Sequence, residues 1–254
     1  ESYRKIRNTF RYLLGNINDK FEDINLDELD IESLPEIEKF MLSKMYSLNK
    51  KFEMYFQKYD FHNLYKELLN FCTVDLSAFY FDIRKDALYC DSINSEKRKS
   101  CVKILNILLK SLLRWFAPIM SFTTEEIYQL VSRKNKSIHL EKFLKFPNKF
   151  KNQKLEEKWS ELIKIRDVCN ISIEEKRASK EIGSSLEADL DIKLNKKYKE
   201  IVGDIDLSEL CIVSKTDINF DKGSDILVET KKALGNKCPV CWKISVDQCK
   251  RHPK

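Results

Sequence analysis

Hydrophobic residues recur every three or four positions through the first 130 residues, a pattern that predicts amphipathic helices. The first helix is expected to bury one face and to present a basic, polar face on another side. Its apolar face comprises Tyr3, Ile6, Phe10, Leu13 and Ile17, and its polar face comprises Arg4, Arg7, Asn8 and Arg11. Three more helices are predicted at about residues 37–59, 63–87 and 96–116. Several amphipathic helices with short joins make an antiparallel bundle.

The join after residue 116 has its own signals. Pro118 is expected to end the preceding helix, because it lacks a backbone donor and disfavours helical geometry in the residue before it. Thr123 and Glu126 are spaced as a capping box for the next helix, with Phe122 and Ile127 as its hydrophobic staple.

The pattern changes after about residue 134. A lysine-rich stretch that contains Pro147 is expected to lie over the bundle as a linker, and a helix should follow at about residues 155–180. Short strands are predicted at residues 188–194, 208–213 and 226–228, around a helix near Tyr198. The predicted fold is mainly α, with an antiparallel helical bundle with basic linker (1–150) and a small α/β junction unit (151–232). Because residues 238–252 carry a Cys-x2-Cys pair and a Cys-x2-His pair, the rest is predicted to be a C-terminal zinc knuckle module (233–254).

Composition limits the compartment and the class of protein. Only five glycines and five prolines occur in 254 residues, as expected for long helices. Eight cysteines without a signal peptide indicate a reducing compartment, which here means the cytoplasm, and no apolar run is long enough to cross a membrane. The chain opens inside a periodic helix without an initial methionine, so we expect it to be part of a larger protein.

The net charge of +6 is distributed unevenly. Residues 133–158 carry nine Lys or Arg against three acids, residues 231–254 carry seven against one, and residues 21–38 carry eight acids and no base. Clustered basic segments favour a polyanionic partner such as RNA, because neutralising phosphates releases counterions. The alternative for any single segment is a solvated lysine-rich surface.

The end of the chain carries candidate metal ligands. Cys238 and Cys241 form a Cys-x2-Cys pair, and Cys249 and His252 form a Cys-x2-His pair, with seven residues between the two pairs. Two such pairs can close a zinc tetrahedron, and a site with four protein ligands is structural rather than catalytic. The alternative is a set of buried thiols, because free cysteine often behaves as a small hydrophobe.

Four parts of the sequence resemble the bacterial isoleucyl-tRNA synthetases. Residues 3–16 (YRKIRNTFRYLLGN) are similar to the first helix of that family's anticodon-binding domain, and residues 116–127 (FAPIMSFTTEEI) look like a turn and helix shared with valyl and leucyl enzymes. Residues 175–178 and 182–188 (EKRA and IGSSLEA) resemble the isoleucyl C-terminal region. The Cys-x2-Cys-Trp ending is similar to that enzyme's zinc module, although a second Cys-x2-Cys after a longer loop is more usual there.

The resemblance implies a function that the hydrophobic pattern does not. Such a chain would bind the anticodon stem-loop of isoleucine tRNA, while catalytic and editing domains elsewhere in the parent would join isoleucine to that tRNA with ATP. The family's HIGH and KMSKS motifs, which bind ATP, do not occur here, and we expect no catalytic residue in this chain. The lone histidines His62 and His139 have no nucleophile motif nearby.

The candidate RNA-binding residues are one helix face and two residues beside the metal ligands, namely Arg4, Arg7, Asn8, Arg11, Trp242 and Arg251. Arg7 and Asn8 could instead hold the bundle against the catalytic domain, and Trp242 could simply pack on the zinc knuckle. Two other classes fit part of the pattern: a zinc-ribbon adaptor that binds another protein, and the matching region of a valyl or leucyl enzyme, which leaves the Cys-x2-Cys-Trp ending unexplained.

Overall fold

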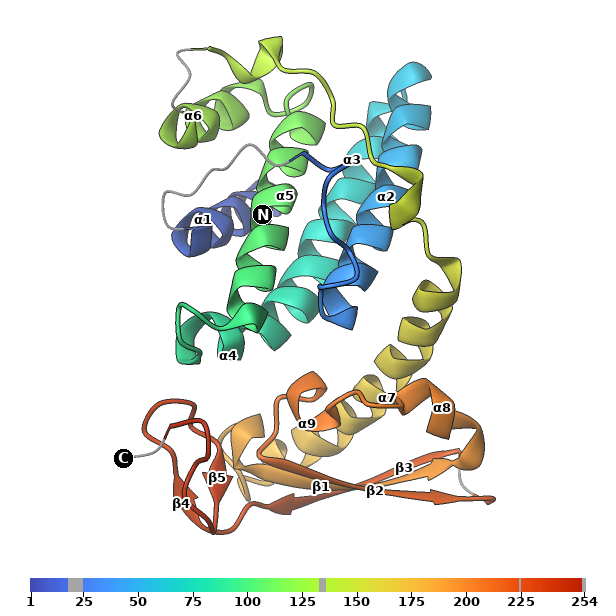
Figure 1. Cartoon of the computed structure of the whole chain (residues 1–254), viewed down its shortest axis with the longest axis vertical. Helices are drawn as coiled ribbons and strands as arrows, with labels where there is room; N and C mark the ends of the chain where they lie inside the picture. Colours follow the sequence, from blue (N-terminus) through green and yellow to red (C-terminus); the bar gives the residue numbers. More distant parts are fainter. Residues whose placement is uncertain (18–24, 133–135, 224, 253–254) are drawn as a thin grey trace. The chain divides into compact units, whose positions relative to one another are not determined.

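The computed structural model describes residues 1–17, 25–132, 136–223 and 225–252. The ends of the acidic and basic segments at 21–24, 133–135 and 253–254 lie outside these ranges. The chain divides into two compact units, Glu1–Gln153 and Lys154–Lys254 (Figure 1). Within the described ranges, no helix is both long enough and apolar enough to cross a membrane.

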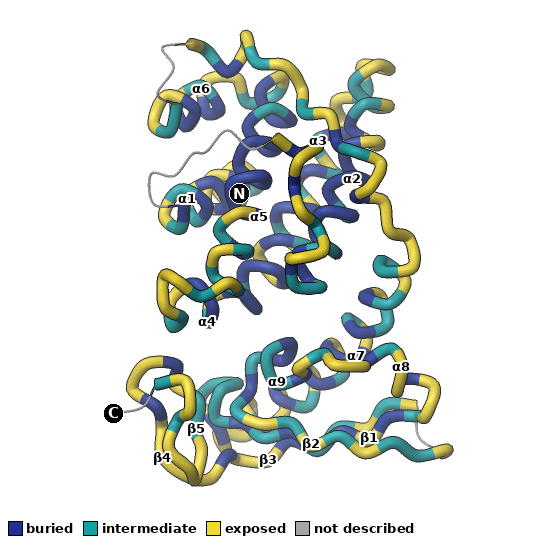
Figure 2. The backbone as a smooth tube through the Cα atoms, viewed as in Figure 1, coloured by how far each residue is buried: buried dark blue, intermediate teal, exposed yellow. Residues whose placement is uncertain are grey.

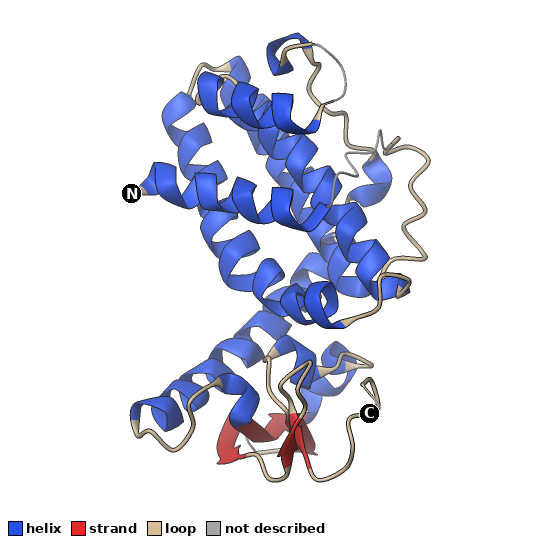
Figure 3. Cartoon of the chain, turned by 90° about the vertical axis from the view of Figure 1, so that its left-hand side faces the viewer, coloured by secondary structure: helices blue, strands red, loops and turns tan. Residues whose placement is uncertain are grey.

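The first unit is built from helices, as the periodicity predicted (Figure 3). They are α1 (Ser2–Ile17), α2 (Glu36–Gln57), α3 (Phe61–Asn70), a π-helix (Phe71–Phe81), α4 (Asp82–Cys90), α5 (Glu96–Phe116) and α6 (Ser121–Val131), followed by single 3₁₀ turns at Ile138–Leu140 and Asn148–Phe150. Helix α5 is central, since it contacts α1, α2, α4 and α6. The expected bundle is therefore confirmed.

The core of the first unit lies along α5, where most residues are buried (Figure 2). Trp115 is 1% exposed, and its indole N–H donates to Asn49 Oδ1 at 3.0 Å, so the ring's one donor is satisfied. A charged pair is also buried here: Arg84 donates from Nε and Nη2 to the two carboxylate oxygens of Glu38, at 2.6 and 2.5 Å. Tyr80 donates to the same carboxylate at 3.2 Å.

The helix predicted at residues 63–87 is present as a continuous helical run from Phe61 to Cys90, but its middle eleven residues form the π-helix, which the periodicity did not indicate. One local prediction for this unit needs correction. The capping box was wrong, because α6 begins at Ser121 and Thr123 already lies inside it. Phe122 is 94% exposed and forms no hydrophobic staple. The predicted end of α5 near Pro118 is confirmed.

The second unit packs the long helix α7 (Gln153–Ala178) and two short helices with a small sheet. Its other elements are a 3₁₀ turn (Ser185–Glu187), β1 (Ala188–Asn195), a 3₁₀ turn (Lys196–Tyr198), α8 (Lys199–Val202), α9 (Leu207–Leu210), β2 (Lys215–Asp221), β3 (Ile226–Lys232), β4 (Asn236–Lys237) and β5 (Ile244–Ser245). The sheet order is β2-β1-β3, with β1 parallel to β2 and antiparallel to β3. Alternate residues of β1 are buried, and α7 reaches the sheet where Ser172 and Thr230 share a hydroxyl hydrogen bond of 2.7 Å.

The predicted strand at residues 208–213 was wrong. Asp206 caps a helical turn there, accepting from the backbone N–H groups of Ser208 and Glu209, and the following strand starts only at Lys215. Leu207, Leu210 and Cys211 are spaced as on one face of a helix, whereas the short apolar run at residues 210–213 also suits a buried strand, so periodicity alone could not separate the two. The strands predicted at 188–194 and 226–228 are present, the second extending to Lys232.

Candidate metal centre and nucleic-acid interface

A short hairpin positions the first pair of candidate ligands. Strands β4 and β5 pair antiparallel, Cys238 N–H donates to Lys243 O at 2.9 Å, and Trp242 N–H donates to Cys238 O at 3.0 Å. The hairpin is anchored to its own unit by Ile244 N–H, which donates to Ser214 Oγ at 2.7 Å. These bonds fold the chain tightly between the two cysteines, so their side chains point the same way.

Gly235 makes this hairpin possible. Its φ is +122°, and a Cβ at this position would lie 2.2 Å from both the carbonyl carbon and the carbonyl oxygen of Ser245. Any side chain would therefore overlap the opposite strand, in a backbone conformation that already favours glycine. The sequence analysis did not single out this residue.

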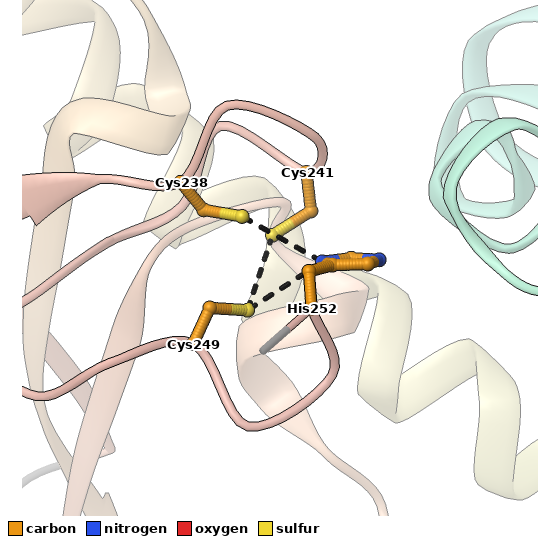
Figure 4. Close-up of side chains that lie close together, drawn as sticks. All are labelled: Cys238, Cys241, Cys249 and His252. Atoms are coloured by element: carbon orange, nitrogen blue, oxygen red, sulfur yellow. Dashed lines mark hydrogen bonds between the residues drawn. The ribbon is translucent and has the colours of Figure 1, made fainter. Parts of the chain in front are cut away.

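Cys238, Cys241, Cys249 and His252 converge on one point (Figure 4). Their ligand atoms all lie within 4.8 Å of one another. The Cys241 and Cys249 sulfurs are 3.8 Å apart, and His252 Nδ1 lies 3.6 Å from Cys238 Sγ and 3.5 Å from Cys249 Sγ. Usual Zn–S and Zn–N bond lengths set tetrahedral edges of about 3.8 Å between sulfurs and about 3.5 Å between sulfur and nitrogen. The four residues are thus arranged to hold a metal ion.

The thiols at this cluster do not share one electrostatic environment. Burial opposes ionisation of Cys238, but hydrogen bonds from the Cys241 and Val240 amides outweigh it and lower the pKa of Cys238 to about 6. Burial also opposes ionisation of Cys249, but hydrogen bonds, mainly from the backbone and ring of His252, outweigh it and lower the pKa of Cys249. Burial raises the pKa of Cys241 to about 11. The lowered pKa values of Cys238 and Cys249 favour the thiolate, the form that binds metal.

The alternative of scattered buried thiols applies to four of the five other cysteines, since Cys90 is only partly buried. Cys72, Cys101, Cys169 and Cys211 are buried, and among the described residues they belong to no cluster that could hold a metal. Burial raises the pKa of Cys72 to about 12, so this thiol stays neutral and packs as a small hydrophobe.

Trp242 lies at the surface beside the metal cluster. It is 58% exposed and adopts φ +63°, a left-handed conformation that is uncommon for a large side chain. Lys237 Nζ lies 5.2 Å from the centre of its ring, within cation–π range. Arg251, in the loop between Cys249 and His252, is also exposed. The hairpin therefore presents an aromatic ring with one cation, Lys237, close to it, and the sequence analysis missed this lysine.

The predicted basic face of α1 is present in the first unit. Ile6, Phe10 and Leu13 are buried, whereas Arg4, Arg7, Asn8 and Arg11 are all exposed. Arg7 lies 3.9 Å from Glu126 of α6, but both side chains are more than half exposed, so this ion pair contributes little. The four polar residues thus remain accessible on one helix, in a different unit from the metal cluster.

Comparison with known proteins gives a consistent result. Residues 38–194 match the family model of the anticodon-binding domain of tRNA ligase. The chain is 64% identical over 252 residues to the isoleucine–tRNA ligase of Pelagibacter ubique, covering 99% of this chain and 28% of that protein. It is 37% identical to the enzyme of that name from Brachyspira hyodysenteriae (95% and 27% covered) and 39% identical to that of Methylacidiphilum infernorum (97% and 26% covered).

The chain therefore spans little more than a quarter of the length of these relatives. The family match covers more than half of the chain itself and includes most of the helical unit, α7 and β1. From this match and the helical bundle, we conclude that the chain belongs to the family of anticodon-binding domains of tRNA ligases.

Proposed function

We propose that this chain recognises the anticodon stem-loop of isoleucine tRNA, as part of a parent enzyme that joins isoleucine to that tRNA with ATP. The observation that carries the proposal is the 64% identity, over nearly the whole chain, to an isoleucine–tRNA ligase. The exposed basic face of α1 and the exposed aromatic ring beside the metal cluster supply chemistry suited to RNA.

The cluster of Cys238, Cys241, Cys249 and His252 is proposed to hold a structural Zn²⁺. Three thiols and one imidazole suit zinc, and the four of them fill a tetrahedron without an open position for substrate. When bound, the ion would cross-link the loop at Cys249–His252 to the hairpin at Cys238–Cys241. Its role is thus to fix the surface that carries Trp242 and Arg251.

RNA contacts are proposed at two surfaces. Unpaired anticodon bases can be splayed out and stacked on an aromatic ring, and the exposed Trp242 offers such a ring. Arg251 and the α1 residues Arg4, Arg7 and Arg11 would neutralise phosphates, and Asn8 offers both a donor and an acceptor. Stacking and phosphate neutralisation determine the affinity for tRNA, whereas hydrogen bonds to the edges of the splayed bases determine sequence specificity.

Activation of isoleucine and hydrolysis of mischarged tRNA are assigned to other domains of the parent enzyme. The chain contains neither of the ATP-binding motifs of the family. The 254-residue chain alone, supplied with tRNA, isoleucine and ATP, is expected to give no charged product.

The proposal is tested by measuring how tightly the 254-residue chain binds isoleucine tRNA and transcripts with exchanged anticodons. We expect the cognate transcript to bind more tightly than each exchanged transcript, in fluorescence anisotropy titrations at fixed salt. A transcript with exchanged acceptor-stem pairs is the control and should bind as the cognate does. Equal affinity for all anticodons would overturn the proposed recognition, and absence of tRNA binding would overturn the RNA role.

A further inference from the structure

A hollow of about 470 Å³ opens on the surface of the first unit between α1, the π-helix and α4. The residues used here are Lys5, Asn8 and Tyr12 from α1, Thr73, Ser77 and Phe81 from the π-helix, and Lys85 from α4. Apart from Asn8, none of these residues belongs to the RNA-binding set proposed above. The hollow thus forms a distinct feature beside the basic face of α1.

The π-helix shapes one wall of this hollow. Such helices are rare beyond a single turn and occur frequently at functional sites, whereas this one runs for eleven residues. Thr73, Ser77 and Phe81 follow one another at intervals of four and line the same wall. The Phe81 ring stacks on the Tyr12 ring, with centroids 4.3 Å apart, which closes part of the hollow with aromatic surface.

The lining carries positive charge and polar groups without an acid. Lys5 and Lys85 are the two charged lining residues. Lys5 lies 3.8 Å from Glu1, which directly precedes α1, and Lys85 lies 3.0 Å from Asp82 on α4. All four side chains are more than a third exposed. Exposed pairs of this kind contribute little to stability, so an incoming anion can compete for both ammonium groups.

Uncharged groups complete the polar lining. Asn8 and Ser77 are exposed and offer an amide and a hydroxyl. Two ammonium groups with amide and hydroxyl donors match the chemistry of a phosphate group, which carries only acceptors. A neutral or cationic ligand would find no counter-charge among these residues.

We propose that this hollow is a binding site for a backbone phosphate of the tRNA. The proposal rests on the proposed function and deepens it, because it adds Lys5, Lys85 and Ser77 to the RNA-binding surface. Phosphate contacts carry no sequence information, so the site would position the tRNA whatever its anticodon.

Charge removal is the first test, made in the full-length parent enzyme. Lys5→Gln and Lys85→Gln should each weaken tRNA binding roughly eightfold at 0.1 M salt and lower the slope of log affinity against log salt by about 0.9, the value of one phosphate contact. Lys99→Gln is the matched control: Lys99 pairs with Glu96 in the same i,i+3 arrangement as Lys85 with Asp82, and the two lysines are 52% and 54% exposed. The control should change neither quantity.

Filling the hollow is the second test, because it leaves the charge unchanged. Ser77→Leu places a larger side chain in the hollow and should lower both affinity and salt slope by blocking the phosphate. Ala78→Leu is the control: Ala78 follows Ser77 in the π-helix but does not line the hollow, so this variant should bind tRNA as tightly as the unsubstituted enzyme. Circular dichroism and thermal unfolding of each variant check that the bundle is intact.

The outcomes separate this site from the proposed function. If the parent binds tRNA and the lysine and Ser77 variants match their controls, the phosphate site is overturned and anticodon recognition stands. The phosphate site is also overturned, and anticodon recognition still stands, if the variants lower thermal stability but leave tRNA affinity unchanged. The hollow would then be a docking surface for another domain of the parent enzyme. If the unsubstituted protein does not bind tRNA, the proposed function itself fails.

Discussion

The buried pair of Glu38 and Arg84 makes a sharp prediction about stability. Glu38 is completely buried and Arg84 is 3% exposed, and two hydrogen bonds of 2.6 and 2.5 Å join them. Arg84→Met removes both bonds and leaves the carboxylate with the Tyr80 hydroxyl at 3.2 Å. Breaking a buried pair by removing one partner costs about 3–5 kcal/mol, because the remaining charge stays desolvated.

This cost can be converted into a measurable shift. At a urea dependence of about 2 kcal/mol per M, a loss of about 4 kcal/mol moves the unfolding midpoint of the first unit down by about 2 M. The double variant Glu38→Met/Arg84→Met removes both charges and should regain most or all of the lost free energy, since apolar replacements of buried pairs are often neutral or stabilising. Lys85→Met, at an exposed neighbour of Arg84, should change the free energy by less than about 0.5 kcal/mol.

The pH dependence has a definite sign. Burial raises the pKa of Glu38 in the folded protein, and the Arg84 guanidinium opposes that rise. Without Arg84 the folded pKa rises further, so the folded state of Arg84→Met favours the protonated acid. The contribution of Glu38 to the stability of the variant is therefore most favourable at low pH and is lost as the pH rises through the folded pKa. Its deficit relative to the parent should be larger at pH 8 than at pH 5.

Urea titrations followed by Trp115 fluorescence measure this free energy. Trp115 is the tryptophan of the first unit, so Trp159→Phe and Trp242→Phe provide a background in which the signal reports that unit alone. The reasoning is refuted if Arg84→Met costs less than about 1 kcal/mol at pH 8. It is also refuted if the double variant is less stable than Arg84→Met.

Three further predictions concern the hairpin and one helix end. Protein purified without chelator should contain about one zinc per chain. Chelation should raise hydrogen exchange at residues 236–252 while the bundle stays protected. Metal analysis that finds no zinc would contradict the proposed metal site. Trp242→Ala should weaken tRNA binding roughly five- to a hundredfold, for a stacking contribution of about 1–3 kcal/mol, with zinc content unchanged; lost zinc would indicate a packing role instead. Tyr59→Gly should stabilise the first unit by about 0.5–1 kcal/mol in urea, because Tyr59 holds φ +55° at the end of α2 with its ring 81% exposed. A destabilised Tyr59 variant would show that the exposed ring contributes more than its backbone strain costs.

The sequence by itself determined the features that depend on neighbours along the chain. The spacing of Ile6, Phe10 and Leu13 fixed a helix with one buried face, because three or four residues complete a turn wherever the helix lies. Cys238 and Cys241 could likewise be paired as ligands from spacing alone, since a tight turn brings both side chains to one side. The structure brings all four ligand residues into one cluster. The identity of the metal as zinc and the choice of RNA-binding residues stay predictions.

Other features were decided only by tertiary structure. Glu38 and Arg84 are 46 positions apart, and nothing in the local pattern shows that both become buried against each other. The turn at Leu207–Leu210 and the misplaced cap at Thr123 show the same limit, because the same apolar spacing or capping motif fits more than one local structure. The hollow lined by Lys5 and Lys85 exists because α1 packs against a π-helix from another part of the chain. Periodicity reports which face of an element is buried, but only packing decides which distant residue lies opposite it.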